Sequence, residues 1–139
     1  METKNLAIGG CLCGQVTYTL SQPPLFTAIC HCTHCQKQSG SAFSVNQVVR
    51  RDDLSIVGEM ASFEDRGDSG GVIHRRFCQT CGSPIVTEPV DNPDISYLKA
   101  GTLNDKSGIG PTVQIWCASA QSWWSPEIEL QAFDRNMPR

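Results

Sequence analysis

The sequence predicts a single all-β domain that covers residues 1–139. Most segments with a readable pattern are short, rich in β-branched and aromatic residues, and separated by Gly, Pro, Asp and Asn. Only the polar stretch 33–39 is typical of a helix, and Gly40 follows it as a C-terminal cap would. The chain has 139 residues and no linker long enough to divide it, so one domain with a modest core is expected.

The first strand is expected at 15–20. Strict alternation there places Val16, Tyr18 and Leu20 on one face, which is typical of a half-buried strand. The remaining strands are expected, on the same grounds of composition and flanking turn residues, at 42–49, 54–57, 72–77, 85–87, 95–100 and 113–116.

Charge and hydropathy exclude several classes of function. The net charge is −3, and no block of Lys and Arg is present to attract phosphate backbones or anionic lipid, so we expect no nucleic-acid partner. Residues 1–10 contain no apolar segment typical of a secretory signal, and no apolar run reaches the ~18 residues needed to cross a bilayer. The protein is therefore expected to be cytoplasmic and to have no membrane contact.

Cysteine is the most informative residue type. The chain has eight cysteines, and seven of them fall into three clusters: Cys11 with Cys13, then Cys30, Cys32 and Cys35, then Cys78 with Cys81. Without an export signal, disulfides are not expected to persist, and metal ligation becomes the leading interpretation. Cys117 lies outside the clusters and is interpreted as a core thiol.

The spacing within the clusters suits a tetrahedral metal ion. Thiolates on one zinc lie ~3.8 Å apart, a separation that Cys-x-x-Cys reaches in a tight turn and Cys-x-Cys after a modest bend. Two pairs can complete a closed site of four thiolates, and the triplet then offers three thiolates with an open position. Spacing by itself leaves a second pairing open, in which Cys11 and Cys13 join Cys30 and Cys32.

Three blocks carry a resemblance to a known family: 10–18 around Cys11 and Cys13, 30–43 around the triplet, and 76–85 around Cys78 and Cys81. In this order they resemble the signatures of the glutathione-dependent formaldehyde-activating enzyme family, also called the centromere protein V family. The resemblance implies the β-tent fold, in which sheets lean together like a tent. In the tail, Gln114 stands where many members have His.

The resemblance also implies two zinc sites. It places a structural zinc on Cys11, Cys13, Cys78 and Cys81, and a second, catalytic zinc on Cys30, Cys32 and Cys35. The implied activity is that of a carbon–sulfur lyase or synthase, with glutathione or another small thiol as co-substrate and formaldehyde or another aldehyde as its partner.

Several residues near the triplet are candidates for further roles. Gln36, Lys37 and Ser39 are the nearest polar groups able to hold the peptide ends of a thiol substrate. His31 and His34 are candidates for a proton shuttle or a fourth metal ligand, against the alternative that they face solvent or cap backbone groups. The competing class of function is a binding module or chaperone in which both zinc ions are structural.

Overall fold

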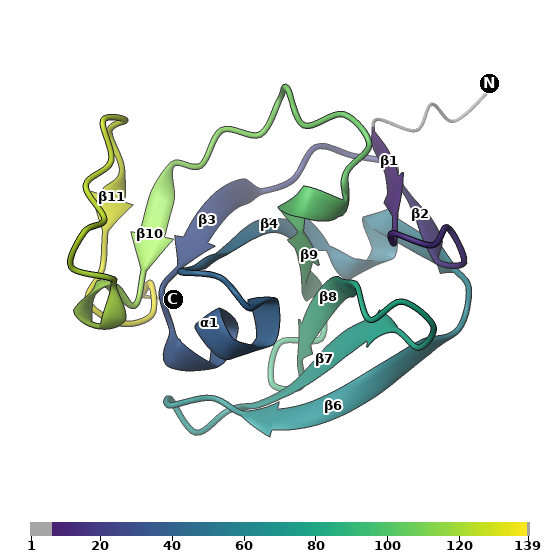
Figure 1. Cartoon of the computed structure of the whole chain (residues 1–139), viewed down its shortest axis with the longest axis horizontal. Coiled ribbons are helices and arrows are strands. Elements are labelled where there is room, and N and C mark those ends of the chain that lie inside the picture. Colours follow the sequence, from purple (N-terminus) through teal and green to yellow (C-terminus); the bar gives the residue numbers. More distant parts are fainter. Residues whose placement is uncertain (1–6, 139) are drawn as a thin grey trace.

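The structure is a computed structural model that describes residues 7–138 (Figure 1). Its chain folds into two β-sheets, one short helix and three single turns of 3₁₀ helix. The strands are β1 Ala7–Gly10, β2 Thr17–Leu20, β3 Phe26–Cys30, β4 Ser44–Arg50, β5 Leu54–Val57, β6 Met60–Arg66, β7 Val72–Cys78, β8 Pro84–Pro89, β9 Ile95–Lys99, β10 Val113–Ile115 and β11 Gln131–Ala132. The helix is α1 Thr33–Ser39, and the 3₁₀ turns are η1 Arg51–Asp53, η2 Ala100–Thr102 and η3 Cys117–Ser119.

The smaller sheet has the order β1-β2-β5, and the larger has the order β11-β10-β3-β4-β9-β8-β7-β6. Neighbouring strands are antiparallel except at β10, which is parallel to both β3 and β11. In Figure 1, α1 lies between β4 and the β6–β7 hairpin, on the open side of the bent larger sheet.

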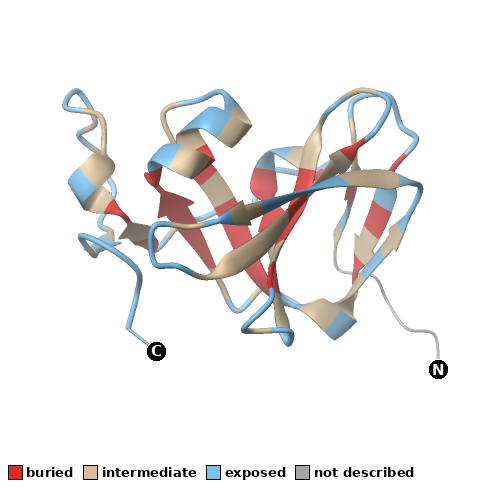
Figure 2. Cartoon of the chain, turned by 90° about the horizontal axis from the view of Figure 1, so that it is seen from below, coloured by how far each residue is buried: buried red, intermediate tan, exposed pale blue. Residues whose placement is uncertain are grey.

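The core lies where the two sheets face each other. Val16, Tyr18 and Leu20 of the smaller-sheet segment pack against Val49 and Leu98 of the larger sheet, and all five are buried. Because side chains alternate across a strand, the residues next to Val49 and Leu98 point to the opposite face of the larger sheet. Figure 2 shows the buried residues concentrated in the strands, with most loops exposed.

The all-β prediction is confirmed. Each predicted strand is present, with ends that differ by at most two residues, and the helix occupies 33–39 as expected. Gly40 caps α1 with φ 65°, a left-handed conformation that glycine adopts without steric cost, and its N–H contacts the carbonyls of Gln36 and Lys37. None of the helices in residues 7–138 is long and apolar enough to span a membrane.

Four strands were not predicted: β1, β3, β6 and β11. The sequence of β1 contains Gly9 and Gly10, which weaken a strand pattern, yet a side chain at Gly9 would overlap the Thr102 carbonyl and the ring of Tyr18. Close backbone approach therefore explains the glycine. β6 is an edge strand with mostly exposed or half-exposed polar residues, so its sequence shows no hydrophobic alternation.

Candidate metal centres and a polar pocket

Two cysteine-bearing turns, far apart in the sequence, meet at one end of the structure. Cys11 and Cys13 lie in the turn between β1 and β2, while Cys78 ends β7 and Cys81 lies in the turn before β8. Their four Sγ atoms all lie within 4.8 Å of one another. The Cys11–Cys13 and Cys13–Cys78 sulfur distances are 3.6 and 3.7 Å.

Backbone N–H groups point at these sulfurs. Val16 donates to Cys11 Sγ at 3.3 Å, and both Thr80 and Cys81 donate to Cys78 Sγ at 3.4 Å. Such donors stabilise thiolates. The pKa of Cys11 is accordingly lowered, chiefly by the Val16 N–H.

Ser83 stabilises the fourth sulfur. Its hydroxyl lies 3.2 Å from Cys81 Sγ and lowers the pKa of Cys81 to about 5, with help from its own backbone. The four thiols therefore fit a closed tetrahedral zinc site, in which thiolate sulfurs are ~3.8 Å apart. The structure thus favours the first of the two pairings that spacing left open.

The cysteine triplet lies at the other end of the larger sheet. Cys30 ends β3, Cys32 is the N-cap of α1 and Cys35 lies in its first turn. All three are buried and pack together with Trp116. Their thiols contact one another, since Cys30 and Cys32 both form side-chain hydrogen bonds with Cys35.

The triplet lies in a positive electrostatic environment. Arg75 Nη1 approaches Cys35 Sγ at 3.9 Å, and Lys99 is close enough to act on Cys35 by charge. Contacts from the Cys30 and Cys32 thiols, together with these two cations, lower the pKa of Cys35 to about 2. Contacts with the Cys32 and Cys35 thiols raise the pKa of Cys30, because neighbouring thiols do not all ionise side by side.

A pocket of about 370 Å³ opens beside the triplet. Its wall is the face of the larger sheet that points away from the core, with alternate residues contributed by five neighbouring strands. These include Ala28 and Cys30 of β3, Asn46 and Val48 of β4, Tyr97 and Lys99 of β9, Thr87 of β8, and Ile73 and Arg75 of β7. This volume is within the range of small-molecule sites.

Asp65 of β6 connects the pocket wall to α1. Its Oδ2 accepts hydrogen bonds from Arg75 Nε and His34 Nδ1, each at 2.9 Å. His34 Nε2 also lies 3.3 Å from Asp68 Oδ1, in the loop between β6 and β7 that borders the pocket. The hydrogen bond to Asp65 raises the pKa of His34, so this histidine links a loop to the helix rather than facing the triplet freely.

His31 is fully buried. Its Nε2 lies 3.0 Å from Gln114 Oε1, which also accepts a hydrogen bond from Trp124 Nε1 at 3.0 Å. The ring packs against Phe43 and Trp124. Its Nδ1 has no partner among the described residues. For His31, the expectation that it points to solvent is therefore wrong.

The predicted substrate contacts lie on α1. Gln36 Nε2 donates to the carbonyls of His31 and Ser119, at 2.7 and 3.0 Å. Ser39 Oγ donates to the Gln36 carbonyl, and Lys37 is exposed. None of Gln36, Lys37 and Ser39 borders the pocket as the structure has it, and their role as substrate contacts stays a prediction.

Sequence reasoning did not find the polar wall of the pocket. Arg75, Lys99, Asn46 and Thr87 are all buried. Lys99 and Thr87 follow the core residues Leu98 and Val86 along their strands, as solvent-facing residues would. Period-2 alternation distinguishes two faces of a strand, but it does not show whether the polar face meets solvent or a pocket.

The architecture defines an all-β protein with two cysteine clusters, one of which is shaped to hold a metal ion. A family model described as "Glutathione-dependent formaldehyde-activating enzyme" matches residues 6–119. The chain belongs to this family.

Curated relatives agree with the family match. Proteins from Aspergillus flavus and Aspergillus oryzae are each 31% identical over 103 residues, which is 70% of this chain and 53% of theirs. Both carry the name "Putative glutathione-dependent formaldehyde-activating enzyme". The chain spans about half the length of these relatives.

A Rhodobacter sphaeroides protein of known crystal structure has a similar fold. Its TM-score is 0.56 at 22% identity, with 75% of this chain and 91% of that chain covered. At this identity the likeness concerns the fold.

Proposed function

We propose that this chain is a zinc-dependent carbon–sulfur lyase or synthase that acts on a thiol–aldehyde adduct such as S-(hydroxymethyl)glutathione. The observation that carries the proposal is the pocket in which the buried triplet meets two buried cations, Arg75 and Lys99. Family membership supports glutathione and formaldehyde as the substrates.

The two cysteine clusters have different roles in this proposal. Cys11, Cys13, Cys78 and Cys81 would hold a structural zinc, since four thiols close its coordination. Cys30, Cys32 and Cys35 would hold the second, with a position left for a substrate. When bound there, zinc would supply a soft Lewis acid that favours the ionised form of a thiol near neutral pH.

The residues of the chain prepare this site for a negatively charged sulfur. Arg75 is 3% exposed and is fixed by Asp65 in an orientation that brings Nη1 to Cys35. Trp116, Ile115 and Ala28 line the pocket with apolar surface, which excludes water and strengthens the attraction between these charges. A thiol and an aldehyde held side by side here would gain from proximity as well as from thiol ionisation.

The competing proposal is a binding module with structural metal only. It is favoured by the four-cysteine cluster, because four thiols close the coordination of a metal ion and leave no position for a substrate. A triplet without metal, or one closed by a fourth protein ligand, would support that module.

The test is the exchange rate between glutathione, formaldehyde and their adduct, measured by exchange NMR with the zinc-loaded protein. We expect the protein to accelerate exchange in proportion to its concentration, and Cys117→Ser to do so equally, since Cys117 lies outside both clusters. Exchange no faster than with heat-inactivated protein would contradict the proposed activity.

A further inference from the structure

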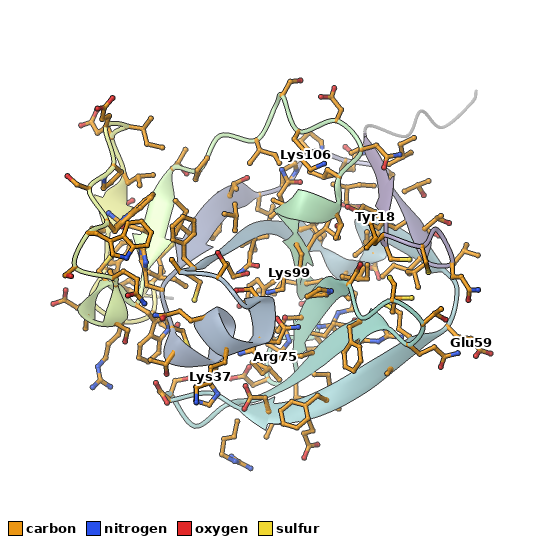
Figure 3. The ribbon with its side chains drawn as sticks, in the orientation of Figure 1. Tyr18, Lys37, Glu59, Arg75, Lys99 and Lys106 are labelled. Atoms are coloured by element: carbon orange, nitrogen blue, oxygen red, sulfur yellow. The ribbon has the colours of Figure 1, made fainter. Side chains whose placement is uncertain are left out.

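Lys99 is a buried cation at the wall of the pocket. It ends β9, it is 8% exposed, and Figure 3 shows it beside α1 in the middle of the molecule. Its Nζ donates hydrogen bonds to Ser44 Oγ and Asn46 Oδ1, both at 3.0 Å. Both acceptors belong to neutral side chains.

Strand register places this ammonium beside the triplet. Ser44 of β4 lies directly opposite Cys30 of β3, and Asn46 lies opposite Lys99 itself. Opposed residues in an antiparallel pair have Cα atoms only ~4.5–5.5 Å apart. Nζ is therefore hydrogen-bonded to Ser44, the residue that lies opposite Cys30. The charge of Nζ acts on both Cys30 and Cys35.

The ammonium has a donor left for a ligand. It carries three N–H bonds, and the two acceptors above use two of them. Among the described residues, no carboxylate lies within ion-pair distance of Nζ. The negative charge that acts on Nζ is that of the triplet thiols, so its place at the pocket wall favours an anionic ligand atom beside the triplet.

Arg75, the other buried cation, uses two of its five N–H groups on protein acceptors. Its guanidinium donates to Asp65 Oδ2 and to Cys35 Sγ. An unsatisfied hydroxyl also borders this pocket: Thr87 Oγ1 is buried, Thr87 lies opposite Arg75 in the β7–β8 pair, and Oγ1 has no partner within residues 7–138. The wall therefore keeps free donors at both cations, and the one on Lys99 is held beside Ser44, which faces Cys30.

We propose that Lys99 is a catalytic residue that binds the aldehyde oxygen of the reacting adduct, an inference that rests on the proposed function. As the adduct forms, the thiolate electron pair makes the carbon–sulfur bond, and the carbonyl π pair moves to oxygen. Lys99 holds the resulting alkoxide, which then takes a proton from water. The proton that the thiol released neutralises the hydroxide left behind, so no net proton is gained or lost. In cleavage the hydroxyl proton leaves first, and the carbon–sulfur pair returns to sulfur.

The decisive variant is Lys99→Met, which keeps the length of the side chain and removes its charge and donors. We expect kcat/KM for adduct cleavage to fall by ~100-fold, the usual loss when one oxyanion donor is removed. Zinc content should stay at the wild-type value. Glutathione affinity, read from the spectrum of the cobalt-substituted protein, should change by less than about threefold, because Lys99 acts on oxygen rather than on sulfur. Lys106→Met, in an exposed loop, is the control.

The outcomes separate this inference from the proposed function. A wild type without turnover contradicts the function, and this inference with it. If the wild type is active and Lys99→Met is equally active, the inference is overturned. It is also overturned if Lys99→Met loses zinc or thiol affinity but keeps the wild-type kcat at saturating thiol. If Lys99→Met does not fold, Lys99→Gln is the variant to test, since it keeps a neutral N–H donor. A ~10-fold loss of kcat/KM then supports the role of Lys99, and wild-type kcat/KM overturns it.

Discussion

Asp65 supplies the carboxylate that balances the buried charge of Arg75. Arg75 is almost entirely buried, and the carboxylate of Asp65, itself 13% exposed, is its ion-pair partner. Burial acts to raise the pKa of Asp65, but hydrogen bonds from His34 and Arg75 outweigh it and lower that pKa. The pair therefore keeps Arg75 both charged and aimed at Cys35.

We predict that Asp65→Asn lowers the free energy of unfolding by about 3 kcal/mol, because it leaves a buried guanidinium without its counter-charge. Urea denaturation at pH 7 measures the loss. Glu64→Gln is the control, since Glu64 lies next along β6 with a side chain that is 72% exposed, and its change should be within about 0.5 kcal/mol.

The difference between wild type and Asp65→Asn should also depend on pH. A carboxyl whose pKa is lowered by folding adds stability above its unfolded pKa of about 3.9, and this stability disappears as the pH falls through the folded value. The two proteins should therefore converge below about pH 4. A difference that persists undiminished at pH 2 would contradict the ion-pair account.

Among the elements, β1 has a glycine that packing requires. Gly9 lies where the backbone meets the Thr102 carbonyl and the ring of Tyr18, which is in the core. We predict that Gly9→Ala destabilises the protein by about 1–3 kcal/mol, because the added methyl forces these groups apart. Gly101→Ala is the matched control, since a methyl there meets no atom within 4 Å. Thermal melts that shift equally would refute the close approach.

The four-cysteine cluster joins elements that are distant in sequence. It joins the turn after β1 to the turn between β7 and β8, so a metal ion bound there would contribute to folding. We predict that Cys78→Ser loses its cooperative thermal transition or aggregates, while Cys117→Ser melts close to wild type. A cooperative melt of Cys78→Ser at the wild-type temperature would contradict a structural role.

Strands in which apolar and polar residues alternate were predicted from sequence. Strands without this alternation, which form through pairing with their neighbours, were not. β2 shows Val16, Tyr18 and Leu20 on one face, as in the structure. β6, at the sheet edge, has no such pattern because little of it is buried. The cysteine clusters could be recognised from spacing, but the cations of the pocket could not. Arg75 and Lys99 are polar residues of ordinary strands, and the pocket also needs loop residues distant in sequence, such as Asp68 and Asn136.

At the scale of the whole molecule, the larger sheet separates two environments. One face packs on β1, β2 and β5 and forms the core, beside which the four-cysteine cluster lies. The opposite face forms the pocket with the triplet, Arg75 and Lys99. This division predicts that the triplet can change without loss of the fold, because its metal would close only the short loop from Cys30 to Cys35.

The central claim is that the triplet holds a metal ion with a position open to a thiol. The most direct measurement is the absorption spectrum of the cobalt-substituted protein, titrated with glutathione, for wild type and Cys32→Ala. We predict two cobalt ions in the wild type and a spectrum that changes with glutathione. Cys32→Ala should keep one ion and the wild-type melting temperature, with no response to the thiol. A wild type with two cobalt ions and a spectrum that glutathione leaves unchanged would contradict the claim.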